Sequence, residues 1–82
     1  MEFLIKGYVN NLTEQNIVDY AYKNGVSVTD EETKIIYLYV KNYWQVFLKG
    51  NADGLFMELR EKLRPNTYQV IVKLFNEYKS KM

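Results

Sequence analysis

Residues 34–49, KIIYLYVKNYWQVFLK, would be apolar around most of the circumference of a helix. At about 100° per residue, the polar side chains of this segment gather in an arc of about 100°. They are Lys34, Lys41, Asn42, Gln45 and Lys49, and only Leu38 lies among them. A helix with so little polar surface packs against neighbours on more than one side. The pattern therefore predicts a central helix.

The start and the end of this helix carry their own signals. Thr29, Asp30, Glu31 and Glu32 match a capping box, in which the Thr hydroxyl and the last carboxylate each accept a backbone N–H of the first turn. Gly50 follows Lys49, the last residue of the segment, and favours the end of the helix there. The central helix should therefore span about residues 30–49.

Short turn signals divide the rest of the chain into further helical pieces. A second helix begins after Thr13, which can cap it, and Gly25 can close it in a left-handed conformation. Asp53 can cap a fourth helix that runs to about residue 63, and a last amphipathic helix covers about residues 66–79. The signals are Asn10-Asn11, Asn24-Gly25, Gly50-Asn51, Asp53-Gly54 and Arg64-Pro65.

Residues 2–10 fit either a helix or a strand. A helix is preferred because no second strand is evident with which they could pair. Together, these segments predict an all-α fold, a compact bundle of four to five short helices around the central one. With 82 residues and no linker or repeat, the chain should form one helical domain over residues 1–82.

Two residue types that carry much of protein chemistry are missing. The chain has no Cys and no His, which removes thiolate metal ligands, the commonest general base and every Ser-His or Cys-His nucleophile. The only run of carboxylates, residues 30–32, lies where helix capping already accounts for it. We expect no enzyme, no cofactor and no metal site.

The same sequence argues against a membrane protein. Lys41, Asn42 and Gln45 interrupt the best apolar run well before the ~18 residues of a membrane span. The opening residues MEFLIKGYV have neither a basic leader nor a small-residue cleavage site. The expected location is the cytoplasm.

The aromatic residues of the central segment are candidates for a protein interface. Tyr37, Tyr39, Tyr43 and Trp44 are of types enriched in interface cores. If some of them stay exposed beside Val40 or Phe47, the patch would suggest a contact site. The alternative is that these rings form the core of the monomer. The favoured function is protein–protein contact, most simply in a homodimer, and no small-molecule substrate is indicated.

Nucleic-acid binding is the alternative function. Residues 1–33 hold two basic and six acidic residues, a net charge of −4, whereas residues 34–82 hold nine and four, a net charge of +5. Basic side chains near tyrosines are typical of nucleic-acid surfaces. The acidic side chains of residues 31 and 32 argue against a DNA-binding role for residues 12–40. The candidate contacts are Arg60, Lys62, Arg64 and Lys73.

Four short motifs carry a family resemblance: Leu12-Thr13-Glu14, Tyr20-Ala21, Gly25-Val26-Ser27-Val28-Thr29 and Val72-Lys73-Leu74-Phe75. In their order, the chain resembles the YqfT-like family of small Bacillota proteins, whose function is uncharacterised. The resemblance spans most of the chain. It implies a cytosolic helical protein from a Gram-positive-type bacterium, and it supplies no site residues.

Overall fold

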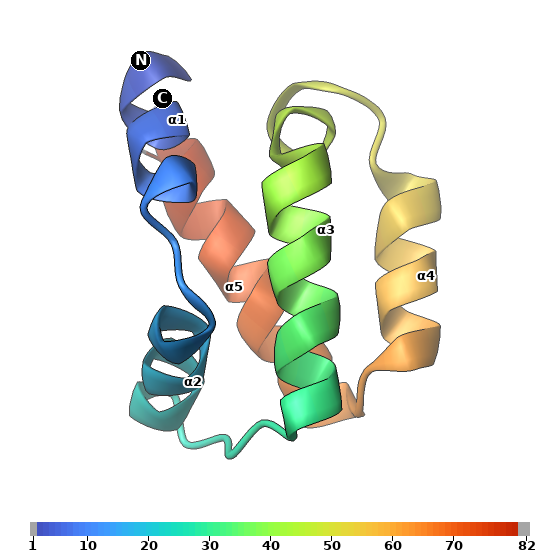
Figure 1. Ribbon diagram of the computed structural model, residues 1–82. Coiled ribbons are helices and arrows are strands. Elements are labelled where there is room, and N and C mark those ends of the chain that lie inside the picture. The colour runs from blue at the N-terminus through green and yellow to red at the C-terminus, as the bar shows by residue number, and fades with distance from the viewer. Residues whose placement is uncertain (1, 81–82) are drawn as a thin grey trace.

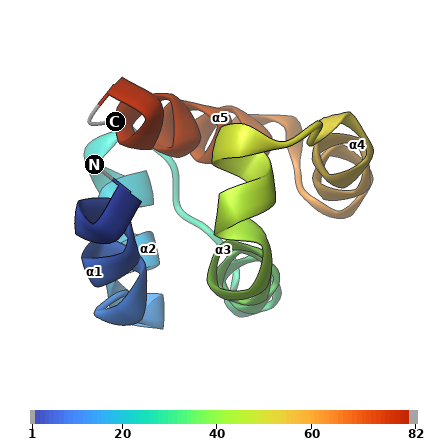
Figure 2. The ribbon, with the colours of Figure 1, turned by 90° about the horizontal axis from the view of Figure 1, so that it is seen from above.

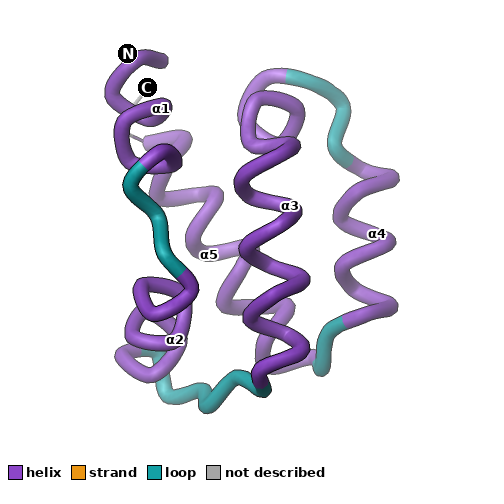
Figure 3. The backbone as a smooth tube through the Cα atoms, viewed as in Figure 1, coloured by secondary structure: helices purple, strands orange, loops and turns teal. Residues whose placement is uncertain are grey.

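Helices joined by short loops form the fold in the computed structural model, which describes residues 2–80 (Figure 1). No strand occurs within this range, as Figure 3 shows. The prediction of an all-α bundle is confirmed, and residues 2–10 form a helix. The elements are α1 (Glu2–Asn10), α2 (Glu14–Lys23), α3 (Asp30–Lys49), α4 (Asp53–Lys62) and α5 (Pro65–Ser80).

The other helices are arranged around α3, as its apolar circumference predicted. It contacts α1, α2, α4 and α5. In Figure 1, α3 stands between the α1–α2 pair on one side and α4 on the other, and α5 crosses behind it. In the view from above, α5 runs along the top of the picture (Figure 2). Figure 2 shows no described helix over the side of α3 that is opposite α5. Although α3 has 20 residues, no helix within residues 2–80 is long and apolar enough to cross a membrane.

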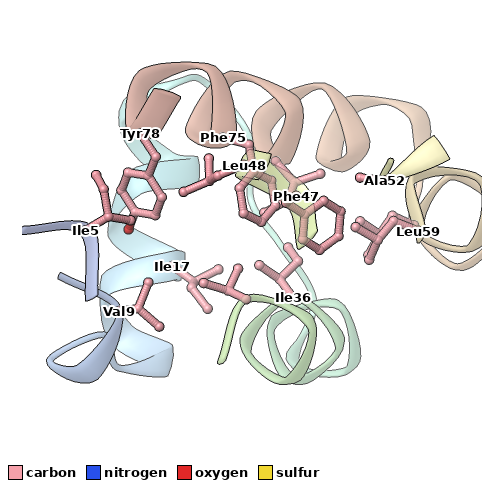
Figure 4. Close-up of a cluster of buried hydrophobic side chains, with 13 residues drawn as sticks. Ile5, Val9, Ile17, Ile36, Phe47, Leu48, Ala52, Leu59, Phe75 and Tyr78 are labelled. Carbon is pink, nitrogen blue, oxygen red and sulfur yellow. The ribbon is translucent and has the colours of Figure 1, made fainter. Parts of the chain in front are cut away.

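Side chains from all of these helices form one core (Figure 4). Near its centre, the ring of Phe47 in α3 stacks on Phe75 in α5, with ring centroids 4.2 Å apart. Phe56 of α4 meets Phe47 edge-on at 4.9 Å. Aromatic pairs in such geometries stabilise beyond the area that they bury. This cluster therefore fixes α3 against both C-terminal helices.

Local side-chain bonds set the starts of α2 and α3. Thr29 Oγ1 accepts the Glu32 N–H at 3.0 Å, and Glu32 Oε1 accepts the Thr29 N–H at 3.2 Å, which confirms the capping box. Thr13 and Asn16 make the same reciprocal pair at α2, with distances of 3.1 and 3.0 Å. Gly25, with φ +80°, follows α2 in the left-handed conformation predicted for it.

The predicted cap of α4 is wrong. Asp53 is the first residue of the helix, and the cap position belongs to Ala52, which offers no side-chain acceptor. The Asn51 side chain instead accepts the Asp53 N–H at 3.1 Å. Two polar residues, on either side of Ala52, could each serve this turn, and the backbone path selects Asn51.

Candidate functional site

The solvent-exposed surface of α3 carries apolar side chains among polar ones, and its polar residues include Glu31, Lys34, Asn42, Gln45 and Lys49. Leu38, Tyr43 and Val46 are 57%, 43% and 39% exposed, respectively. Ile35 and Tyr39 belong to the same face of the helix and are half-buried. At about 100° per residue, these side chains and the exposed Asn42 fall within an arc of about 140°, which also contains the exposed Glu31 and Lys49. We refer to residues 35, 38, 39, 42, 43 and 46 as the α3 outer stripe.

The spacing within the stripe is that of a helix–helix seam. Ile35, Tyr39, Asn42 and Val46 follow one another at intervals of four, three and four residues. Side chains at these intervals line one face of a helix and, in paired helices, pack against the partner. The seam is ~16 Å long, about three turns. Its geometry suits a second helix laid along α3.

Tyr39 is held in place within the stripe. Its hydroxyl donates to Glu58 Oε1 of α4 at 3.1 Å. Its ring lies 5.7 Å from the ring of Tyr43, tilted by 57°. Burial and the Glu58 carboxylate raise the pKa of Tyr39, so the phenol keeps its proton. Two rings already fixed in position lose little conformational freedom when a partner binds.

The structure divides the four residues predicted as interface anchors between two sides of α3. Tyr37, Tyr39 and Trp44 are all half-buried against the core, and only Tyr43 is exposed. Tyr39 lies on the side nearer α4, whereas Tyr37 lies on the side nearer α1. Lys41 marks that side, because its Nζ lies 5.4 Å from the Tyr37 ring centroid and donates to the backbone carbonyl of Asn10 at 3.1 Å. The four residues therefore do not form a single surface.

Sequence reasoning missed the aliphatic part of the stripe. The predicted apolar circumference of the helix includes Ile35 and Val46, and Leu38 lies alone among the residues of the predicted polar arc. The four-three-four spacing was the available signal. Leu38, the apolar residue within the polar arc, was the second signal that this face of the helix is not uniformly polar.

The basic residues predicted to contact nucleic acid are spread over the molecule. Lys73 donates to the side chain of Asn24, the residue after α2, and it lines a hollow between α5 and the loop that follows α2. Arg60 lines a separate groove of about 500 Å³ between α4 and α5, and Lys62 is exposed. Arg64 is held by Glu32. These positions do not converge, and nucleic-acid binding stays a prediction from sequence alone.

Glu32 and Arg64 form a clamp between the start of α3 and the turn from α4 to α5. Arg64 Nη2 lies 2.8 Å from Glu32 Oε1, and its backbone N–H donates to Oε2 at 2.9 Å. The same guanidinium donates to the carbonyl of Ser27 at 2.6 Å. Burial alone would raise the pKa of Glu32, but the bonds from Arg64 and from the Thr29 backbone lower it to about 2. Glu32 is therefore ionised at neutral pH, and its oxygens are occupied by structural bonds.

Comparisons with known proteins place the chain in a family without supplying a function. No curated protein and no solved structure matches it. A family model described as a protein of unknown function, DUF2624, matches residues 1–79. The expected membership of a family without known function is confirmed, whereas the YqfT-like identity stays a prediction. Because the match covers nearly the whole sequence, this chain belongs to the DUF2624 family.

Proposed function

We propose that this protein is a cytoplasmic, non-enzymatic helical protein that acts through protein–protein contact at the α3 outer stripe. A second copy of the chain is the simplest partner. The observation that carries the proposal is that three large apolar side chains, Leu38, Tyr43 and Val46, are exposed within one arc of α3, beside the polar Asn42 and Lys49. Large apolar side chains grouped on one helix face favour a contact surface over an ordinary solvated face. The bacterial, YqfT-like origin belongs to the same proposal and rests on the short motifs.

The size of the stripe sets the expected affinity. A stable protein interface buries about 800 Å² on each partner. Three turns of one helix face supply a few hundred Å², with the adjoining edge of α4 around Glu58 as a polar rim. This contact is smaller than a stable interface, so we expect weak association, with a dissociation constant of about 1 µM or more, equivalent to about −8 kcal/mol or less favourable. The expected complex is therefore a reversible dimer.

Replacing Leu38 with Lys is expected to weaken self-association at least ~10-fold, because it places a charge in the contact beside the seam residues. The measurement is sedimentation velocity of both proteins from about 1 to 100 µM. Leu38 is largely exposed in the monomer, so the substitution should leave the helical circular dichroism spectrum and the unfolding midpoint unchanged.

Tyr22→Lys is the matched control. Tyr22 is 74% exposed and lies on α2, away from the stripe. We expect this variant to associate like the wild type. The proposal fails if the wild type is monomeric throughout the range, or if Tyr22→Lys and Leu38→Lys weaken association equally.

A further inference from the structure

The seam within the α3 outer stripe is symmetric about the midpoint between residues 40 and 41. Ile35 and Val46 lie equally far from that point on either side, and so do Tyr39 and Asn42. A two-fold axis through it, perpendicular to the helix, would set each of these residues opposite its counterpart on a second copy. Closed two-fold dimers are the commonest oligomers, and they require a self-complementary patch of this kind.

We infer that two copies of this chain pair α3 against α3 in antiparallel orientation, with this two-fold axis at their centre. The inference rests on the proposed function and names the partner and the register. Ile35 packs on Val46 of the second copy, and Tyr39 packs on Asn42 of the second copy. Leu38 and Tyr43 lie on opposite sides of the seam. Leu38 lies next to Leu38 of the second copy, and Tyr43 lies next to Tyr43 of the second copy.

In this register, Asn42, the amide residue of the seam, has a hydrogen-bond partner in Tyr39 of the second copy. Tyr39 donates its hydroxyl hydrogen to Glu58 within its own chain, which leaves the phenol oxygen as an acceptor. The side-chain amide of Asn42 on the second copy carries two donors. One of them can therefore bond to Tyr39 instead of being buried without a partner, which would be costly.

The charges at the two ends of α3 also favour the antiparallel register. Glu31 and Lys49 project from the same side of the helix, nearly equidistant from the axis. Antiparallel pairing sets Glu31 beside Lys49 of the second copy, twice in the dimer. Parallel pairing would set like charges together at both ends, and it would align the two helix dipoles unfavourably.

Disulfide trapping distinguishes the two registers, and it is clean because the chain has no cysteine of its own. Two single variants, Ile35→Cys and Val46→Cys, are mixed under mild oxidation, one of them with a tag that changes its size. In the antiparallel pair these positions face each other, whereas Ile35 and its own counterpart are ~16 Å apart along the helix. A disulfide needs Cα atoms within about 7 Å. We expect the mixed species to exceed either self-linked species at least ~10-fold.

The controls make each outcome decisive. Ile35→Cys mixed with Tyr22→Cys should stay unlinked, because Tyr22 is on α2. A self-linked Ile35→Cys dimer would establish parallel pairing and overturn the inference. If sedimentation shows a dimer and the mixed pair does not form, the register is wrong while the proposed contact function survives. If sedimentation shows no dimer, the proposed function itself has failed.

Discussion

Replacing Phe47 with Ala is expected to lower the free energy of unfolding by about 3–5 kcal/mol. Phe47 is 2% exposed, stacks on Phe75 and meets Phe56 edge-on, so its removal opens a cavity between three helices. A domain of this length has a stability of about 4–12 kcal/mol, and this one residue accounts for a large part of it. Urea unfolding followed by circular dichroism measures the loss.

Tyr43→Ala is the control for this prediction. Tyr43 lies one turn before Phe47, about 40° from it around the helix, but it is 43% exposed. Its removal should therefore lower the free energy of unfolding by less than about 1 kcal/mol. Similar losses for Tyr43 and Phe47 would mean that α3 does not face the core as described. Such a result would remove the basis for the outer stripe as well.

Replacing Glu32 with Gln is expected to lower the free energy of unfolding by about 2 kcal/mol. The side chain of Glu32 is 7% exposed and holds the Arg64 side chain and backbone. Loss of a hydrogen-bonded buried charge costs about 1.5–3 kcal/mol. The value stays moderate because Arg64 is 55% exposed, so water screens part of the pair. Thermal or urea unfolding at pH 7 is the measurement.

Glu31→Gln is the matched control, because Glu31 is the exposed neighbour in the same helical turn. Glu31→Gln should change the free energy of unfolding by no more than about 0.5 kcal/mol. Equal effects at the two positions would show that general charge at the helix start, rather than the clamp to Arg64, stabilises this end of α3.

The clamp also predicts how stability depends on pH. The folded-state pKa of Glu32 is lowered from its ordinary value of 4.5 to about 2. A carboxyl group with a lowered folded pKa contributes its full stability above pH 4.5, and this contribution is lost as the pH falls through about 2. The stability difference between the wild type and Glu32→Gln should therefore shrink over this acidic window. A difference that stays constant from pH 6 to about pH 2 would contradict the assignment.

The boundaries of the fold could be predicted because they depend on local chemistry. The predicted span of 30–49 for the central helix agrees with α3, since both its capping box and Gly50 act within one turn. The prediction that Asp53 caps α4 was wrong for a related reason. Asn51 and Asp53, on either side of Ala52, could each serve that turn, and only the backbone geometry selects between them.

The parts that sequence could not supply depend on distant segments. Glu32 and Arg64 are 32 residues apart, so no spacing rule pairs them. The sequence assigned Glu32 to the capping box and Arg64 to the candidate nucleic-acid contacts. Likewise, Tyr37 and Tyr39 belong to one aromatic run, yet α1 and α4 flank them on different sides. Which arc of α3 stays open depends on where the other helices pack.

The most direct test of the α3 contact surface is a dilution series of amide nitrogen–proton correlation spectra of the wild-type chain. We expect the signals that shift between about 10 and 500 µM to fall mainly at residues 35–46 on the outer stripe. Signals from the groove between α4 and α5 should stay fixed. Spectra that do not change with concentration, or changes confined to helices other than α3, would contradict the proposal that a second copy covers this face.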